Sequence, residues 1–235
     1  MKIDFAGKVA LVAGGTGGLG RSVSLAFLDE GAKVVVPYRS EKEFVELKRA
    51  AAGRESQLIG RAVDVLDEGA VAKLVEEIGR IDMLVNTVGG YVGGVELWKL
   101  APANLDRMLN LNLRTGYLLA HAVVPGMLQL SSGAVVNVCA KAALDHGAGA
   151  SAYAASKAAS LAMMDSLAAD TRGKGVRVNS VLPSIIDTKA NREAMPDANF
   201  DTWPKPEDIA KVILFLASDA AKVVHGAAVT VYGDS

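Results

Sequence analysis

Short apolar runs recur along the chain and alternate with stretches in which apolar residues return at helical spacing. The first run, residues 9–13, meets a glycine-rich turn, and Leu19, Val23 and Phe27 follow at intervals of four. A continuous apolar run bounded by turn residues is typical of a strand buried on both faces, whereas the later spacing is typical of an amphipathic helix. The pattern predicts a strand, a tight turn and a helix that continues up to Gly31.

The same alternation continues to the end of the chain. Parallel strands need crossover connections, and seven strands separated by helices predict one α/β domain over residues 1–235. We expect a Rossmann fold with a doubly wound, mostly parallel, seven-stranded sheet and helices on both faces. The loop-like segment 184–205 is predicted to be a substrate lid. The predicted strands are 9–13, 34–36, 62–65, 83–86, 134–138, 176–182 and 229–232, and the later helices are 41–52, 67–78, 104–127 and 152–171.

Composition narrows the class of protein. The chain has 25 lysines and arginines against 26 aspartates and glutamates, so no surplus charge favours nucleic acid or an anionic membrane. Cys139 is the only cysteine, and the three histidines lie far apart, so we predict neither a disulfide nor a metal site. Cys139 is expected to be a small core residue. The charged N-terminus lacks the apolar stretch of a signal peptide, which predicts a cytoplasmic protein.

The glycine-rich turn and the end of the second strand predict a dinucleotide site. Glycines at 14, 18 and 20 allow a sharp turn and a close approach of a pyrophosphate to the helix N-terminus. An acidic residue after the second strand would bind the ribose of NAD, whereas Arg39 stands there and suits the 2′-phosphate of NADP. NADP(H) is therefore favoured and NAD(H) remains possible, although Arg39 could also be merely solvated. Asp64 is predicted either to bind adenine or to cap the next helix.

Tyr153 and Lys157 are candidate catalytic residues. They stand four residues apart at the start of a predicted helix, so both side chains project from one face. A tyrosine hydroxyl titrates near ~10, and a neighbouring ammonium is expected to lower that pKa and so favour proton transfer. A tyrosine and a lysine four residues apart also occur by chance on exposed helices. The pair therefore indicates catalysis only together with the other predicted site residues.

Together these residues resemble the short-chain dehydrogenase/reductase family over essentially the whole chain. The resemblance implies that Tyr153 donates a proton, that Lys157 also holds the nicotinamide ribose, that Asn112 supports a proton relay and that Thr188 contacts the carboxamide. It also implies a homodimer or homotetramer. The residues that it places around the cofactor are Gly14, Gly18, Leu19, Gly20, Arg39, Asp64, Asn86, Gly89, Tyr153, Lys157, Pro183 and Thr188.

The sequence departs from the family pattern at the position thirteen residues before Tyr153. The family carries a substrate-orienting serine there, and this chain has Ala140. The stretch 140–145, the loop 89–94 and the lid resemble a subgroup that tolerates this absence, the quinonoid dihydropteridine reductases. The expected substrate contacts are Ala140, Tyr91, Asn191 and Trp203, with the alternative that the two aromatic residues only anchor their loops.

The sequence therefore predicts an NAD(P)H-dependent oxidoreductase that transfers a hydride to a small organic substrate. A dihydropterin or another quinonoid acceptor is favoured, because such a ring accepts hydride without strong polarisation of a carbonyl. The alternatives are a broad carbonyl or alcohol dehydrogenase of the same family and a non-catalytic NADP-binding redox sensor. Retention of Tyr153, Lys157 and Asn112 argues against the sensor.

Overall fold

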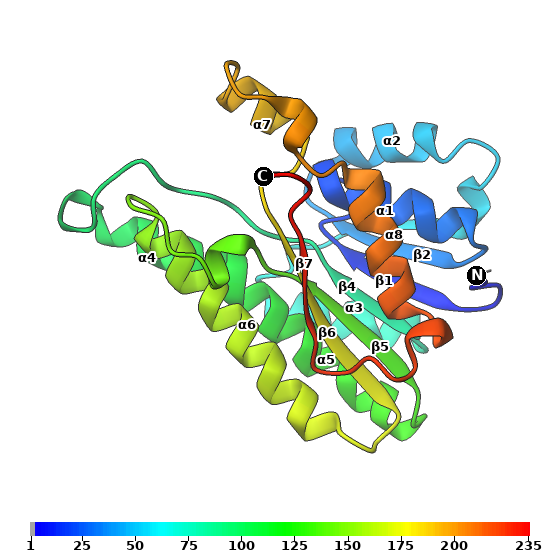
Figure 1. The fold of residues 1–235 in the computed structure, drawn as a ribbon. Helices are drawn as coiled ribbons and strands as arrows, with labels where there is room; N and C mark the ends of the chain where they lie inside the picture. The colour runs from blue at the N-terminus through cyan, green and yellow to red at the C-terminus, as the bar shows by residue number, and fades with distance from the viewer. Residues whose placement is uncertain (1–2) are drawn as a thin grey trace.

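A seven-stranded parallel sheet lies at the centre of the protein (Figure 1). The computed structural model describes residues 3–235. Every neighbouring pair of strands is parallel, in the order β3-β2-β1-β4-β5-β6-β7. The strand order reverses between β1 and β4, so a crevice is expected at their carboxyl ends. The strands are β1 Val9–Ala13, β2 Lys33–Tyr38, β3 Leu58–Ala62, β4 Met83–Asn86, β5 Gly133–Val138, β6 Val176–Pro183 and β7 Ala228–Val231.

Helices cover both faces of the sheet and form two cores with it. On β1, Val12 packs in the core shared with α1, α2 and α8, whereas its neighbour Leu11 packs in the core shared with α3, α5 and α6. Successive residues of a strand face opposite sides, so each fully buried strand supplies both cores. The predicted doubly wound α/β domain is confirmed. The helices are α1 Gly18–Asp29, α2 Glu41–Ala50, α3 Glu68–Ile78, α4 Pro102–Leu109, α5 Thr115–Gln129, α6 Ser151–Thr171, α7 Lys189–Ala194 and α8 Pro206–Ala217.

The third strand lies earlier in the chain than the sequence predicts. β3 spans Leu58–Ala62 and pairs with β2 from Leu58 to Ala62, so the prediction of 62–65 is wrong. At the edge of the sheet only Leu58 of this strand is fully buried, which weakens its apolar pattern. Val63 and Val65 pack against the core from the following loop. Their apolar side chains produce the pattern that predicts a strand in the sequence.

Two other segments differ from the predicted elements. The helix expected at 104–127 is divided into α4 and α5 by a π turn at Asn110–Arg114, which keeps the chain helical and so preserves the apolar periodicity. The segment 184–205 is not structureless, because it contains α7 and a 3₁₀ turn at Phe200–Thr202. Both segments border the carboxyl edge of the sheet, where the functional residues gather.

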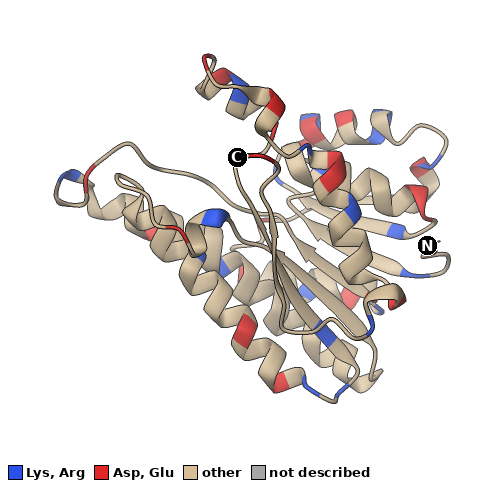
Figure 2. Ribbon diagram, viewed as in Figure 1, with Lys and Arg blue, Asp and Glu red and all other residues tan. Residues whose placement is uncertain are grey.

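Positively and negatively charged residues are interspersed along the ribbon (Figure 2). Within residues 3–235, no helix combines the length and apolar character required to cross a bilayer. The same part of the chain places no three histidine, cysteine or acidic side chains where they could share a metal ion.

Candidate active site

The turn between β1 and α1 has the geometry of a phosphate-binding loop. Gly14 has a φ of +76°, a conformation that glycine adopts without strain. A Cβ on Gly20 would lie 2.0 Å from the Gly14 carbonyl oxygen, so the turn and the helix can pack this closely only without that side chain. The amide groups of the first turn of α1 have no partner within the helix, and a helix N-terminus favours an anion. A dinucleotide pyrophosphate fits this turn.

A cavity of about 280 Å³ lies beside the glycine turn and brings together four of the residues predicted from the sequence, namely Gly14, Arg39, Asp64 and Gly89. These residues come from β1, the end of β2 and the loops after β3 and β4, which meet at the carboxyl edge of the sheet. The carboxylate of Asp64 accepts a hydrogen bond from the Leu66 amide at 3.0 Å, while Asp67 caps α3. The capping alternative for Asp64 is therefore wrong.

The part of this cavity next to the end of β2 holds charges of both signs. Arg39 is exposed and makes no ion pair with any residue of the described chain. Glu43, which the sequence analysis missed, lines the same cavity and accepts a hydrogen bond from the Thr16 hydroxyl at 3.0 Å. Thr16 was missed as well, although its position between the glycines is a usable signal. Arg39 thus remains available for an anionic group.

Lys157 is buried at the end of β5, where its Nζ donates a hydrogen bond to the Val138 carbonyl at 3.0 Å. Burial lowers the pKa of Lys157 to about 8. Burial, followed by Tyr91 and Cys139, raises the pKa of Tyr153 to about 12. The prediction that the ammonium lowers the pKa of Tyr153 is therefore wrong for this structure, because desolvation is the largest cause of the rise and Lys157, with a pKa of about 8, is already neutral at the pH where Tyr153 titrates. The site holds a protonated tyrosine at neutral pH.

Asn112 ties the catalytic helix to the loop after β4. From the π turn, its amide nitrogen donates to the Gly90 carbonyl and to the Ser156 hydroxyl, both at 3.0 Å. Its amide oxygen accepts from the Gly90 nitrogen at 2.9 Å. A Cβ on Gly89 would lie 3.0 Å from the Asn112 oxygen and 3.2 Å from Lys157 Nζ, so the two predicted catalytic side chains converge there. Ser156, which the sequence analysis missed, donates in turn to the Tyr153 carbonyl at 2.7 Å.

A second polar chain runs beneath the site and is structural. Asn86 donates to Asn137 at 2.9 Å and accepts from the Val88 amide at 3.2 Å, so its side chain supports the loop after β4. Asn86 is not among the residues that line the cavity beside the glycine turn, and its predicted place near the cofactor stays a prediction. Asn137 donates to the Cys139 sulfur at 3.2 Å, and burial raises the pKa of that thiol. Cys139 packs in a small apolar cluster with Leu161, which confirms its expected role as a core residue.

The expected substrate residues divide into two groups. Tyr91 lies beside Tyr153, with ring centroids 5.0 Å apart in an edge-on arrangement, and Ala140 is buried directly after β5. Trp203 instead is only 6% exposed and packs against Phe200 at 5.0 Å. This packing favours the alternative in which Trp203 anchors its segment on the body of the protein, and its contact with the substrate stays a prediction.

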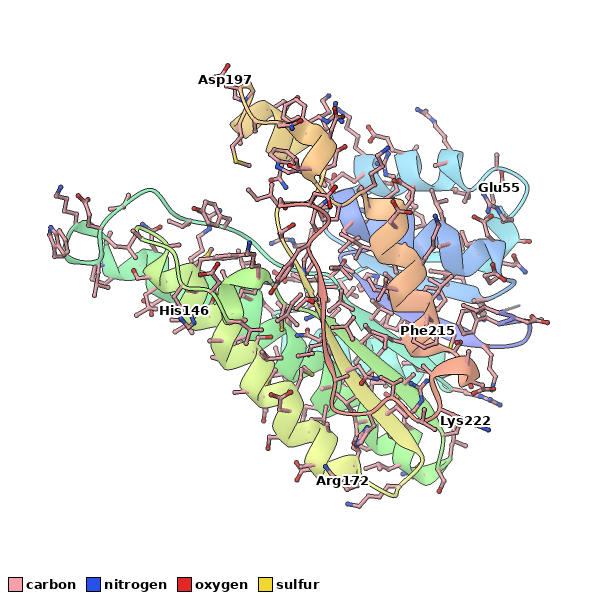
Figure 3. All side chains as sticks on the ribbon, viewed as in Figure 1. Glu55, His146, Arg172, Asp197, Phe215 and Lys222 are labelled. Atoms are coloured by element: carbon pink, nitrogen blue, oxygen red, sulfur yellow. The ribbon has the colours of Figure 1, made fainter. Side chains whose placement is uncertain are left out.

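The base of the segment 184–205 lies against the glycine turn. A Cβ on Gly18 would come 2.8 Å from the Thr188 methyl group, and the Thr188 hydroxyl accepts from the Asn191 amide at the start of α7. The Asn191 side chain donates to the Ile186 carbonyl at 2.8 Å and is thereby held within the segment. Pro183 is buried at the end of β6, and the Leu19 side chain lies in the core, so only its backbone faces the turn. Figure 3 shows the side chains on the ribbon, with Asp197 labelled beside α7.

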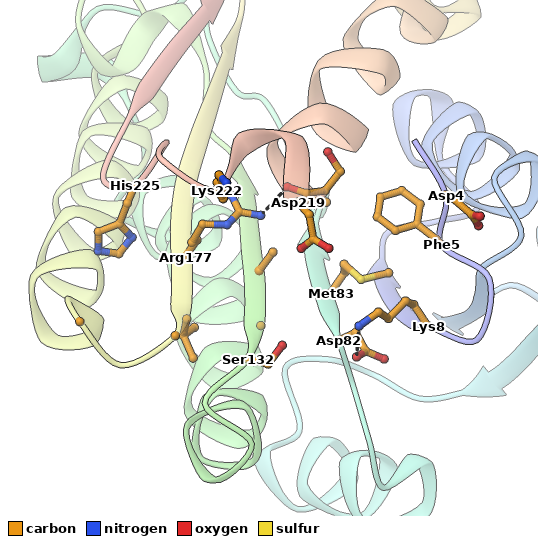
Figure 4. Close-up of a pocket in the computed structure, with 17 residues that line it drawn as sticks. Asp4, Phe5, Lys8, Asp82, Met83, Ser132, Arg177, Asp219, Lys222 and His225 are labelled. Carbon is orange, nitrogen blue, oxygen red and sulfur yellow. Dashed lines mark hydrogen bonds and ion pairs between the residues drawn. The ribbon is translucent and has the colours of Figure 1, made fainter. Parts of the chain in front are cut away.

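A different cavity, of about 420 Å³, lies at the opposite end of the sheet (Figure 4). Several of its charged groups are already engaged within the fold. Asp82 pairs with Lys8 and Arg80, and the Arg177 guanidinium donates to the Leu216 and Ser218 carbonyls at 2.6 and 2.9 Å. These contacts connect the amino ends of the strands to the end of α8 and explain the polar lining as structural.

A model of the family described as short chain dehydrogenase matches residues 8–199. The chain belongs to the short-chain dehydrogenase/reductase family. It is 32% identical to 3-oxoacyl-[acyl-carrier-protein] reductase FabG of Thermotoga maritima, with 97% of each chain covered. It is 33% identical to D-threitol dehydrogenase of Mycolicibacterium smegmatis, with 97% of this chain and 92% of the relative covered. The solved structure of ElxO with NADP bound superposes with a TM-score of 0.90 at 25% identity, over 96% of this chain and 97% of that one.

Membership of the short-chain dehydrogenase/reductase family defines the class of reaction. The protein is an NAD(P)-dependent oxidoreductase that acts on a small-molecule substrate. The family match extends from β1 through the glycine turn, Asn112 and the Tyr153–Lys157 pair into the segment after β6. The fold and the enzyme class predicted from the sequence are confirmed.

Proposed function

We propose that this short-chain dehydrogenase/reductase uses NADPH to reduce a small, flat, electron-poor ring such as a quinonoid dihydropterin or a quinone. The observation that carries the proposal is the Tyr91 ring beside Tyr153, in a chain that has Ala140 where the family has a serine. A methyl group at Ala140 cannot polarise a ketone, whereas a quinonoid ring accepts hydride readily. An aromatic side chain beside the proton donor suits a planar substrate.

In the proposed reaction Tyr153 is the general acid. When bound, NADPH supplies a hydride, the π pair of the acceptor C=N or C=O bond moves to the heteroatom, and that atom takes the Tyr153 hydroxyl proton. A pKa of about 12 keeps this proton in place at neutral pH until transfer. The Lys157 ammonium favours the phenolate that remains, and Asn112 holds the loop over the site and supports reprotonation.

The cofactor is held by backbone at the glycine turn and by side chains around it. Gly14, Gly18 and Gly20 admit the pyrophosphate, Asp64 meets the adenine and Thr188 meets the carboxamide. Gly89 and Lys157 border the nicotinamide ribose. Arg39 binds the 2′-phosphate bidentately, which favours NADPH over NADH. The NADP named in the ElxO structure supports the same preference.

Arg39→Ser tests this cofactor preference. We expect the ratio of kcat/KM for NADPH to that for NADH to fall at least about tenfold, since a charge-assisted contact is worth ~1.5–3 kcal/mol. Arg49→Ser, which removes an exposed arginine from the last turn of α2, is the matched control. An unchanged ratio in Arg39→Ser would remove this residue from phosphate recognition.

The proposal also covers the segment after β6, the assembly of the enzyme and its compartment. Residues 184–205 form the substrate lid, held in shape by the bidentate Asp187–Arg192 pair at 2.5 and 2.8 Å and by Arg192 over the Phe200 ring at 4.6 Å. The enzyme forms a homodimer or homotetramer. Its expected compartment is the cytoplasm.

A broad carbonyl or alcohol dehydrogenase is the second candidate. The names of two relatives, a 3-oxoacyl reductase and a threitol dehydrogenase, favour this reading. Neither name includes a pterin or a quinone. The two candidates differ in whether an unactivated ketone is reduced.

The deciding experiment follows the loss of NADPH and NADH absorbance with quinonoid dihydropterin, quinones and a panel of ketones in parallel. Rapid oxidation with the ring acceptors supports the proposal, and turnover of ketones alone supports the second candidate. Cofactor binding without turnover of any acceptor would contradict both and indicate a redox sensor. Tyr153→Phe is the control for enzyme-catalysed turnover, because it removes only the proton donor.

A further inference from the structure

Hydride transfer to a C=O or C=N bond places negative charge on the heteroatom. Donors that already point at this atom stabilise the transition state, and removal of one such donor costs an enzyme about 10² to 10³ in kcat. The heteroatom can accept more than one hydrogen bond, and Tyr153 supplies only one of them. The neighbours of the Tyr153 ring therefore decide whether the site has a second donor.

Three residues are candidates for this second donor. Ala140 offers a buried methyl group. Cys139 is buried in the core, and its sulfur already accepts a hydrogen bond from Asn137 at 3.2 Å. Tyr91 lies with its ring centroid 5.0 Å from that of Tyr153 and at 78° to it, and 64% of its surface is exposed. Of the three, Tyr91 alone carries an oxygen donor on the open side of the site.

The loop that carries Tyr91 is shaped around its hydroxyl group. A Cβ on Gly93 would lie 1.9 Å from the Tyr91 oxygen and 2.3 Å from the ring carbon that bears it, so the phenol packs over Gly93 only because that residue has no side chain. The base of the loop is fixed by the two hydrogen bonds between Gly90 and Asn112 at 2.9 and 3.0 Å. The phenol is therefore held between the loop and the catalytic tyrosine.

We propose that the Tyr91 hydroxyl is a second catalytic donor, which hydrogen-bonds the same acceptor atom that takes the proton from Tyr153. Tyr91 keeps its proton throughout, while the bond from the Tyr153 oxygen to its hydrogen breaks and the new bond to the acceptor heteroatom forms. This donor occupies the role that a serine hydroxyl at position 140 would otherwise fill. The inference rests on the proposed reductase function and specifies how that site polarises its substrate.

The test is a double-mutant cycle between positions 91 and 140, with NADPH and the acceptor that the wild-type enzyme reduces fastest. Tyr91→Phe keeps the ring and removes only the hydroxyl, so we expect kcat to fall roughly ten- to a hundredfold with the KM changed by less than about twofold. In the Ala140→Ser background, where a new hydroxyl is present, the same change should lower kcat by less than about threefold. An aromatic contact alone would not produce this pattern.

Two further variants keep the test decisive. Gly93→Ala displaces the phenol without touching Tyr91 itself and should lower kcat like Tyr91→Phe. Tyr117→Phe removes an exposed tyrosine hydroxyl from α5 and should leave kcat unchanged.

An unchanged kcat in Tyr91→Phe, or an equal loss in both backgrounds, overturns the role of Tyr91 while the reductase function stands. Failure of the wild-type enzyme to reduce any acceptor removes the proposed function and this inference together.

Discussion

Tyr153 and Lys157, the proposed catalytic pair, are both shifted toward their neutral forms by burial. The pKa of Tyr153 rises to about 12 and that of Lys157 falls to about 8, with desolvation as the largest cause for each. The tyrosine therefore carries its proton throughout the neutral range, whereas the charge of the lysine titrates just above neutrality. This arrangement suits reduction, in which the enzyme must donate a proton.

The pH dependence of reduction follows from Lys157. Its ammonium is present below the pKa of about 8 and is lost as the pH rises through that value. We expect kcat/KM for reduction to be level near neutral pH and to fall across pH ~8, because the phenolate left on Tyr153 then loses its nearby positive charge. Steady-state rates across this range provide the measurement, and a level profile up to pH ~10 would contradict the assignment.

Lys157 is also expected to lower the stability of the fold. Its folded pKa lies below the unfolded value, so the unfolded chain binds the proton more tightly and stability rises with pH between about 8 and 10.5. Lys157→Met should raise the free energy of unfolding by about 2 kcal/mol at pH ~7, given ~1.4 kcal/mol per pKa unit and the loss of the bond to Val138. Urea unfolding should show that this gain in stability becomes smaller toward pH ~10. A gain that does not change with pH would contradict its assignment to the charge of Lys157.

At the scale of elements, the π turn between α4 and α5 brings Asn112 into the site. Single π turns inside α-helices widen the helix locally and are frequent at functional sites. Here the turn buries Asn112 while its neighbour Asn110 stays exposed. The side chain then connects the loop after β4 to α6 through Gly90 and Ser156. Two elements distant in the sequence are thereby held in one geometry.

Asn112→Ala should release the loop at 89–101. It removes both bonds to Gly90, so we expect faster amide hydrogen exchange in this loop and little change in the strands. Asn110→Ala changes the same side chain type on the exposed side of the turn and is the control. Equal exchange in the two variants would show that the loop is held by other contacts.

At the scale of the whole molecule, one sheet joins two cores. Phe27 of α1 is fully buried on one face and Leu119 of α5 on the other, and every central strand supplies residues to both. A loss of packing on either face therefore weakens the same sheet. The site at the carboxyl edge depends on both cores, since the glycine turn leads into α1 on one face while Tyr153 and Lys157 lie on α6 on the other.

Phe27→Ala and Leu119→Ala should lower the same unfolding transition. Large-to-small substitutions of this kind cost about 3–5 kcal/mol for phenylalanine and about 2–5 kcal/mol for leucine. Circular dichroism and tryptophan fluorescence should report one shared midpoint for each variant, shifted downward from the wild type. Separate transitions in either variant would indicate that the two faces unfold independently.

The sequence by itself determined the alternation of strands and helices, the glycine turn and the pair on α6. These features are local, because a buried strand, a tight turn and residues four apart on a helix each need only neighbouring positions to be recognised. The end of β2 likewise places Arg39 by its position alone. The cavity that contains Gly14, Arg39, Asp64 and Gly89 agrees with that reading.

Only the tertiary structure decided what depends on contacts between distant segments. The limits of β3 follow from its pairing with β2, and the burial of Trp203 follows from its packing on Phe200. The high pKa of Tyr153 follows from desolvation, which no spacing reveals. The packing of Tyr91 beside Tyr153 joins two chain segments about sixty residues apart. Their distance in sequence carries no signal of that contact, because only the folded sheet brings the loop after β4 next to the start of α6.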